Sequence, residues 1–304
     1  MSTRTNRAAL ERAATAFHAM WLETASAIMS SDWYDEVSST GAIESYQLMD
    51  GAGAVREWLG ERQFKVPQVW ELELKNKDWE NSTFVPVNAV EDDTLGHYAG
   101  QVRMFMSRLK AHPDRLMAEL LTGGFAANGY DGVPFFATSH PTATGTQSTR
   151  ITGGSGTTLA TAAFQNAYAL LQGATDYAGE PLGLVEAPDA EVQLVVGPSN
   201  RATADSIVTV ATTSSGAGNP NYSLAKVKVN PYLIGDYAAY WYLVVAKAPV
   251  RPFVLQVRRA PDVRIITDPD DIEVRNNRRI PIIGDGRWNA GYRFWQSIVG
   301  SNGA

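Results

Sequence analysis

The chain has no cysteine among its 304 residues. This excludes disulfide bonds and metal sites built on thiolates, so any covalent reinforcement of the fold would need other chemistry. Histidine is also scarce. The four histidines (His18, His97, His112 and His140) lack the close spacing of a zinc site. We therefore predict no zinc site.

Long apolar runs and an excess of basic residues are absent as well. No stretch approaches the roughly 20 apolar residues needed to span a bilayer. The N-terminus leads into an amphipathic segment rather than an apolar secretory core. We therefore expect no membrane contact and no signal peptide, in a soluble protein made in the cytoplasm. The formal net charge of −6 argues against a general nucleic-acid binder.

The composition that remains is typical of a folded soluble protein. Hydrophobic residues make up 44% of the chain and charged residues 19%, at a length that suffices for one large domain or two ordinary ones. Residues 251–304 hold nine Arg against six Asp or Glu, a net of +3, which leaves −9 elsewhere in the total of −6. This asymmetry suits docking between protein copies or contact with nucleic acid, and a solvated face of mixed charge explains it equally well.

Residues 8–29 have the apolar spacing of an amphipathic helix. Leu10, Phe17 and Trp21 fall on one face of such a helix. A helix near a chain end can dock on its own domain or on a neighbouring molecule. In a protein that assembles with copies of itself, we favour the neighbour.

Residues 68–90 show the period-two alternation of strands. Two such runs are separated by the polar residues 78–82, so we predict one long antiparallel hairpin. Its charged side chains would discourage indiscriminate edge pairing. With few apolar contacts of its own, this hairpin would make a better arm than core element.

A long helix is predicted over residues 93–121. Asp92, Asp93 and Thr94 supply capping oxygens at its start. Pro113 should kink or break it, because proline lacks an amide hydrogen and clashes with the preceding turn. The full segment would reach about 40 Å as a helix.

The rest of the chain combines loops, helices and a β-rich block. Gly, Ser and Thr dominate the first loop, which we expect to be flexible and exposed. In chain order, we predict that loop at 142–158, a helix at 159–172, a β-rich block at 188–250 with a short helix at 201–210, strands at 253–259, 262–266 and 292–298, and a tight turn at 284–286.

Three motifs follow one another between residues 55 and 141. They are Arg56-Glu-Trp-Leu-Gly-Glu-Arg, Glu91-Asp-Asp-Thr-Leu-Gly and Tyr130-Asp-Gly-Val-Pro-Phe-Phe. In these motifs, and more weakly in Ala290-Gly-Tyr-Arg-Phe-Trp-Gln, the chain resembles the Mu-like prophage major head subunit family, gpT. The recognisable likeness extends over about half of the chain.

That family is similar to tailed-phage capsid proteins with the Hong Kong 97-type fold, an α+β architecture. The resemblance implies five regions, in which the amphipathic helix belongs to the arm, the charged hairpin is the extended loop and the long helix is the spine. The regions are an N-terminal arm at 1–42, an extended β-hairpin loop region at 43–91, a peripheral domain with the spine helix at 92–187, an axial domain at 188–250 and a return to the peripheral domain at 251–304.

The resemblance also implies a structural function, with no catalysis and no cofactor. We expect a major capsid protein of the virion, whose hexamers and pentamers form an icosahedral shell around phage double-stranded DNA without sequence-specific binding. Its partners would be a scaffolding protein, a portal and a decoration protein. The alternatives are an encapsulin-like shell around protein cargo and a hydrolase with an unrecognised site.

A hydrolase site would be sought at Asp131, Ser139 and His140, where an acid, a nucleophile and a base occur together. A Ser hydroxyl rarely reaches the imidazole of the next residue, and no Gly-x-Ser-x-Gly motif surrounds Ser139. We therefore predict no catalytic residue there. The resemblance implies instead that Ser139-His-Pro is a turn after a strand at Phe135-Phe136. The acidic residues 91–93 could bind a divalent cation, but helix capping explains them without a ligand.

The remaining candidates concern contacts between subunits. Lys75 or Lys77 could form an isopeptide bond with a neighbour's Asn, as in some capsids of this fold, but no cross-linking motif of the gpT family matches here. For Arg275, Arg278 and Arg279, we favour contact with a neighbour's acidic surface over contact with packaged DNA. Salt bridges between subunits and salt bridges within one chain are equally open for Arg56, Glu57, Glu61 and Arg62. Solvent-exposed pairs would contribute only about 0–1 kcal/mol each. The interface candidates are Trp21, Arg56, Glu57, Glu61, Arg62, Lys75, Lys77, Glu80, Arg275, Arg278 and Arg279.

Overall fold

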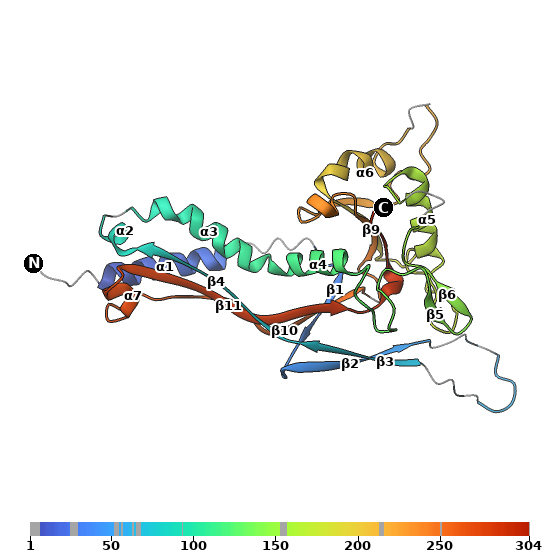
Figure 1. Cartoon of the computed structure of the whole chain (residues 1–304), viewed down its shortest axis with the longest axis horizontal. Helices are drawn as coiled ribbons and strands as arrows, with labels where there is room; N and C mark the ends of the chain where they lie inside the picture. Colours follow the sequence, from blue (N-terminus) through green and yellow to red (C-terminus); the bar gives the residue numbers. More distant parts are fainter. Residues whose placement is uncertain are drawn as a thin grey trace, which may run out of the picture.

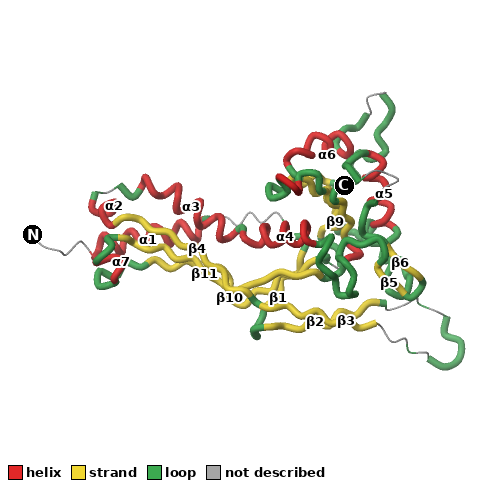
Figure 2. The backbone as a smooth tube through the Cα atoms, viewed as in Figure 1, coloured by secondary structure: helices red, strands yellow, loops and turns green. Residues whose placement is uncertain are grey.

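The protein is elongated and combines helices with several separate sheets (Figure 1). Its computed structural model describes residues 7–24, 30–51, 55, 57–62, 64, 68–92, 94–152, 157–212, 216–249 and 251–303. A long lobe, made of α1–α4, α7 and the sheet beneath them, extends to one side. A second lobe, made of α5, α6 and a smaller sheet, lies at the other end (Figure 2).

The long-lobe sheet has the strand order β1-β10-β11-β4. β1 (Tyr34–Ser38) runs parallel to β10 (Phe253–Ile265). β10 pairs antiparallel with β11 (Arg279–Tyr292), and β11 with β4 (Lys77–Pro86). The two strands predicted between 253 and 266 are one strand, β10, whose register shifts twice against β11. These long strands extend the lobe away from the rest of the molecule.

Helices α1 (Arg7–Glu23), α3 (Gly96–Lys110) and α4 (His112–Gly123) pack on this sheet. The break predicted in the long helix is confirmed: it falls at Ala111, and Pro113 occupies the first turn of α4, where its missing amide hydrogen costs no helix bond. The apolar sides of the three helices and the sheet beneath them bury one continuous core.

The predicted cap of the long helix is wrong. An extra short helix, α2 (Val87–Glu91), occupies this region, and Asp92 is its C-terminal cap rather than the start of α3. α3 follows Leu95, and no described side chain caps its first turn. Asp93 lies outside the described residues.

The predicted hairpin over 68–90 is also wrong in its pairing. β3 (Gln68–Lys75) pairs antiparallel with β2 (Ile43–Asp50), whereas β4 pairs with β11. Only Asn76 separates β3 from β4, and its buried amide donates to Ser39 Oγ and Gly41 O at 2.7 and 2.9 Å. These bonds hold the chain as it crosses from one sheet to the other. We call the β2–β3 pair the ribbon; it runs below the long-lobe sheet in Figure 1.

The second lobe is built on a four-stranded sheet of order β12-β9-β7-β8. It confirms the predicted helices at 159–172 and 201–210 and the strands of the β-rich block. Its elements are α5 (Thr161–Gln172), β7 (Glu191–Val196), α6 (Arg201–Val208), β8 (Lys226–Val229), β9 (Trp241–Ala246) and β12 (Ile298–Ser301), with the short 3-10 helices η1 (Pro198–Asn200), η2 (Gly235–Tyr237) and η3 (Trp295–Ser297).

Both faces of β9 are buried, which explains its unbroken apolar sequence. Trp241 and Leu243 join the core under α5 and α6, whereas Tyr242 and Val244 join the core of the long lobe. Tyr242 also donates its hydroxyl to the carbonyl of Leu121 in α4, at 3.0 Å. The two lobes therefore share buried surface along this strand.

Three further predictions need correction. Residues 284–286 lie inside β11 and form no turn: a Cβ on Gly284 would stand 2.6 Å from Leu109 of α3, so glycine lets the strand pass close beneath the helix. The strand predicted at 292–298 is instead the end of β11, η3 and the start of β12. The loop at 142–158 contains part of a small hairpin, β5 (His140–Thr142) with β6 (Gly145–Gln147).

Candidate assembly surfaces and the buried histidine cluster

The ribbon has one face against the body and one open face. Leu48 and Leu74 are buried on the inner face, and Tyr46 donates its hydroxyl to Gln256 of β10 at 2.7 Å. On the open face, Met49 is 66% exposed. The ribbon therefore lies along the body and does not stand out as the arm predicted for the 68–90 hairpin, of which only β3 belongs to the ribbon.

The described residues between the two strands (55, 57–62 and 64, here called the ribbon tip) carry an exposed apolar group. Trp58 donates its indole N–H to Gly60 O at 2.6 Å, and the Arg62 guanidinium lies 4.8 Å from the Trp58 ring centroid. The exposed apolar side chains are those of Val55, Trp58, Leu59 and Phe64, at 101%, 67%, 74% and 90%. Large apolar side chains exposed together are typical of an interaction site.

The interface candidates predicted from the sequence include the charged residues of this segment but none of its apolar ones. Glu57, Glu61 and Arg62 are exposed in the ribbon tip. Arg56 lies outside the described residues. A sequence signal for these apolar residues does exist. Trp, Leu and Phe side chains occur between charged residues, in a segment without helical or strand periodicity. Such a group has no place in a core.

Trp21 is a core residue, so its selection as an interface residue was wrong. Its side chain is only 7% exposed, and α1 docks on its own α3. Lys110 of α3 donates to the carbonyls of Trp21 and Thr24, both at 2.7 Å, and its ammonium lies 4.3 Å from the Trp21 ring centroid. The apolar face of this helix is therefore covered within the chain.

Lys75, Lys77 and Glu80 are all exposed where the ribbon meets β4. Lys77 lies 5.9 Å from the ring centroid of Trp79, and Glu80 accepts a hydrogen bond from Ser82. Glu80 also borders an open cleft of about 620 Å³ beside the α3–α4 junction. These three residues stay candidates for contact with another copy.

The arginines Arg275, Arg278 and Arg279 come together where α7 (Ile272–Arg275) leads into β11. Arg278 donates to Asn88 Oδ1 at 2.8 Å and to Glu91 Oε2 at 2.7 Å. Glu91 is therefore an ion-pair partner rather than a cap or a cation ligand.

The other two arginines have partners of their own chain as well. Arg279 lies 4.5 Å from the ring centroid of Phe84, and Arg275 donates to Asn276 Oδ1 at 3.2 Å. Part of this basic cluster is therefore engaged within the subunit, which leaves less of it for a neighbour or for DNA.

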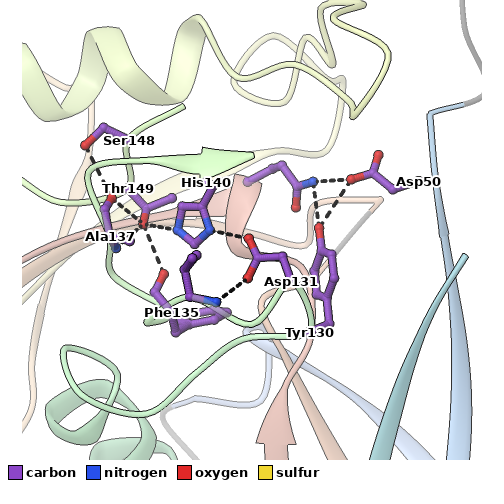
Figure 3. Close-up of polar contacts among 10 residues, drawn as sticks. Asp50, Tyr130, Asp131, Phe135, Ala137, His140, Ser148 and Thr149 are labelled. Atoms are coloured by element: carbon purple, nitrogen blue, oxygen red, sulfur yellow. Dashed lines mark hydrogen bonds and ion pairs between the residues drawn. The ribbon is translucent and has the colours of Figure 1, made fainter. Parts of the chain in front are cut away.

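Asp131 and His140 meet in the interior, but without Ser139, which is exposed (Figure 3). Asp131 Oδ2 lies 2.6 Å from His140 Nδ1, and Thr149 Oγ1 lies 2.9 Å from His140 Nε2. Trp295 stacks on the imidazole, with ring centroids 4.1 Å apart. We call Asp131, His140, Thr149 and Trp295 the histidine cluster. The turn predicted at Ser139-His140 is wrong for His140, which begins β5.

The histidine cluster has the order of a hydrolase triad, but its side chains are buried in the described structure. The side chains of His140 and Asp131 are 0% and 1% exposed, and Thr149 is 2% exposed. The Thr149 hydroxyl lies 3.0 Å from the carbonyl of Phe135 and accepts from the amide of Ala137 at 3.2 Å. These contacts fix the segment before β5 to the segment after β6, which is a structural role.

Two features are absent from the described ranges. There, no three His, Asp or Glu side chains come together in a way that could hold a metal ion. In the same ranges, none of the helices combines the length and apolarity needed to cross a membrane.

The fold is similar to those of several solved capsid structures. The procapsid subunit of bacteriophage JBD30 matches with a TM-score of 0.54 and 21% identity, over 94% of this chain and 72% of that one. The capsid of the cyanophage P-SCSP1u matches with a TM-score of 0.53 and 9% identity, over 88% and 86%. These matches show a mixed α+β fold like that of phage capsid proteins.

Sequence comparisons identify the family. The Mu-like prophage FluMu major head subunit of Haemophilus influenzae is 24% identical over 260 residues, 86% of this chain and 61% of the relative. The major capsid protein of Escherichia phage Mu is 30% identical over 105 residues, 34% of each chain. The matches thus span less than two thirds of either relative. The family model of the Mu-like prophage major head subunit gpT matches residues 8–155, 149–233 and 234–304. The chain therefore belongs to the Mu-like prophage major head subunit gpT family.

Proposed function

We propose that this chain is the major capsid protein of a Mu-like phage, whose copies form an icosahedral shell around double-stranded DNA in the virion. The observation that carries this proposal, beside the family, is the ribbon tip. Its exposed apolar side chains lie apart from both cores. The role is structural, so the chain needs no catalytic residue and no cofactor.

The finer assignment of regions follows the Hong Kong 97-type plan. α1 belongs to the arm (1–42), α3 and α4 form the spine of the peripheral domain (92–187), and the β7–β9 sheet lies in the axial domain (188–250). The C-terminal region (251–304) supplies β10 and β11 to the long lobe. Within the extended loop region (43–91), the ribbon and its tip are the loop itself, whereas β4 belongs to the long-lobe sheet.

The subunits would join by heterologous contacts, in which one surface meets a different surface of the next copy. In Figure 1 the ribbon tip lies far from the long lobe, so the molecule does not cover its own tip with that lobe. Repeated contacts of this kind close into rings when the rotation allows. Hexamers and pentamers, with a scaffolding protein, a portal and a decoration protein as assembly partners, complete the proposal.

A second candidate is a shell that encloses protein cargo. It is favoured by the similarity to a virus-like particle from Pyrococcus furiosus, which has a TM-score of 0.50 and 10% identity over 96% of this chain and 98% of that one. The two shells differ in their content rather than in their subunit fold. Analysis of nucleic acid in native particles distinguishes them.

Electron microscopy of the purified protein tests the proposal. We expect shells or rings in negative stain, with the phage's scaffolding protein increasing the yield of closed shells. A protein that stays monomeric under all assembly conditions would contradict both shell proposals. Denaturing electrophoresis of the particles tests the cross-link at Lys75 or Lys77: a ladder of covalent multimers supports it, and a single monomer band rules it out.

A further inference from the structure

The end of the ribbon nearest its tip is held by one carboxylate. Asp50, the last residue of β2, accepts from the amide of Tyr177 at 3.0 Å, from the side chain of Gln296 at 2.7 Å and from the hydroxyl of Tyr130 at 3.2 Å. Gln296 also donates to the Tyr130 hydroxyl at 3.1 Å. We call these four residues the Asp50 cluster. Three body segments that are distant in the sequence thus meet at one ribbon residue. Figure 3 shows the contact between Asp50 and Tyr130.

Aromatic packing supports the same junction from β3. Trp70 lies 5.8 Å from the ring centroid of Tyr130 and 6.3 Å from that of Tyr177. Burial raises the pKa of Tyr130, so its hydroxyl stays protonated and available as a donor. A cavity of about 190 Å³ borders Asp50 and Gln296 on the other side. The junction therefore depends on a few directed contacts rather than on dense packing all around.

The opposite end of the ribbon is attached independently. Gln256 donates to the carbonyl of Leu74 at 3.2 Å, and Asn289 donates to that of Lys75 at 2.8 Å. If the contacts of Asp50 were lost, these bonds would keep the ribbon joined to the long lobe at that end. Each ribbon strand has eight residues, or about 26 Å. A small change of angle at the attached end would therefore move the tip end by several times more than it moves the base.

The backbone leaves the ribbon directly after this junction. Gly51 has a φ of +88°, and a Cβ there would lie 3.3 Å from the Tyr177 Cβ and the Ala178 amide. Only glycine readily adopts this conformation. Gly51 therefore lies against the same body segment, around Tyr177, that donates to Asp50.

We propose that Asp50 is a positioning residue for subunit contact: it sets the angle of the ribbon against the body and thereby places the ribbon tip for a second copy. This inference rests on the proposed shell function. The Asp50 cluster also adjoins the histidine cluster, because Tyr130 precedes Asp131 and Gln296 follows Trp295 (Figure 3). The Asp50 cluster thereby connects the ribbon to a buried part of the molecule.

Spin-label distances test the angle, and the absence of cysteine leaves no background labelling. Labels go on Leu59→Cys in the tip and Ala202→Cys in α6, both exposed. We expect one narrow distance distribution in the parent and a broadened or second distribution in Asp50→Asn, which keeps the size but presents an amide to the three donors. Glu73→Gln removes a carboxylate from the ribbon's open face and should match the parent.

Two further readouts separate positioning from stability. Hydrogen exchange of the Tyr177 amide should become at least about tenfold faster in Asp50→Asn, since its acceptor is weakened. In the label-free protein, electron microscopy should show a loss of regular shells. Tyr130→Phe, which removes only the hydroxyl, gives a milder second variant should Asp50→Asn fail to fold.

The outcomes decide between the two proposals. Unchanged distances in Asp50→Asn and Tyr130→Phe would overturn the positioning role, as would altered distances with shells identical to those of the parent. A parent chain that forms no shells would instead overturn the proposed function, and it would remove the subunit contact for which Asp50 is said to position the tip.

Discussion

Among single residues, His140 shows how the local fold depends on a buried polar contact. Replacing His140 with Ala would leave the Asp131 carboxylate, whose side chain is 1% exposed, buried without its partner. We expect a loss of about 3–5 kcal/mol in the free energy of unfolding. Urea denaturation measures it. The neighbouring Ser139→Ala removes an exposed hydroxyl and should change stability by less than about 0.5 kcal/mol. Equal effects of the two substitutions would contradict the structural role of the cluster.

His112 should make stability depend on pH. Burial, with a smaller effect of Arg115, lowers the pKa of His112 below its ordinary value of 6.5, and Trp288 donates its indole N–H to His112 Nδ1 at 3.1 Å. The folded state therefore favours the neutral imidazole. Its contribution is fully present above pH 6.5 and is lost as the pH falls through the lowered pKa.

Urea denaturation at pH 8 and pH 5 measures this dependence. The loss of stability toward acid should be smaller in His112→Gln than in the parent. His97→Gln, at an exposed position on α3, should keep the parent's dependence. If His112→Gln also kept the parent's loss of stability toward acid, His112 would not be the group that causes this loss.

At this scale the sequence allowed the right residues to be considered, but not their partners. Asp131 and His140 can be linked from the sequence because they are an acid and a base close together in it. Thr149 cannot, because it reaches the imidazole only through the β5–β6 hairpin. Similarly, the apolar face that includes Trp21 could be recognised from its spacing. The surface that covers this apolar face of α1 is decided by tertiary packing. In this structure it is α3 of the same subunit.

Among the secondary-structure elements, two glycines should respond in opposite ways to the same substitution. Gly100 lies inside α3, and a Cβ there would meet nothing within 4 Å; Gly100→Ala should stabilise by about 0.5–1 kcal/mol. Gly284 in β11 lies under α3, and a Cβ there would crowd Leu109 at 2.6 Å and Phe105 at 3.2 Å. Gly284→Ala should destabilise by about 1–3 kcal/mol. Thermal unfolding of both variants checks the signs, and a stabilising Gly284→Ala would contradict the close packing of α3 on β11.

The helices were predicted well because the sequence patterns that indicate them lie among neighbouring residues. The 3.6-residue period of α3, α4 and α5 and the break near Pro113 can be read from neighbouring residues. Strand pairing cannot. β3 and β4 are consecutive and both alternate, yet they belong to different sheets, because β2 and β11 compete for them as partners. The alternation fixed which residues face inward, and only the tertiary fold fixed the neighbour.

For the whole molecule, the C-terminal region joins what the sequence suggested were separate domains. β10 and β11 form the centre of the long-lobe sheet, and the same region ends as β12 at the edge of the second-lobe sheet. β9 buries one face in each core. The lobes are thus covalently and physically linked, and we expect them to move as one body. The ribbon is attached along one face only, and its other face is open.

The ribbon tip provides the sharpest prediction at this scale, because its side chains contribute little to the stability of one subunit. Trp58 and Leu59 are 67% and 74% exposed, so the double variant Trp58→Ser/Leu59→Ser should unfold within about 0.5 kcal/mol of the parent. In a shell these side chains would be covered by a neighbour. Losing about 2 kcal/mol per contact would raise the protein concentration needed for assembly roughly thirtyfold.

Light scattering over a concentration series measures this threshold, and urea denaturation of the unassembled subunit confirms the fold. Val210→Ser, which also replaces an exposed apolar side chain but lies in the second lobe, is the matched control and should assemble as the parent does. A tip variant that assembles at the parent's concentration would show that the exposed apolar group is not a subunit contact. A variant that assembles poorly but also unfolds easily would assign these side chains to the stability of the subunit itself.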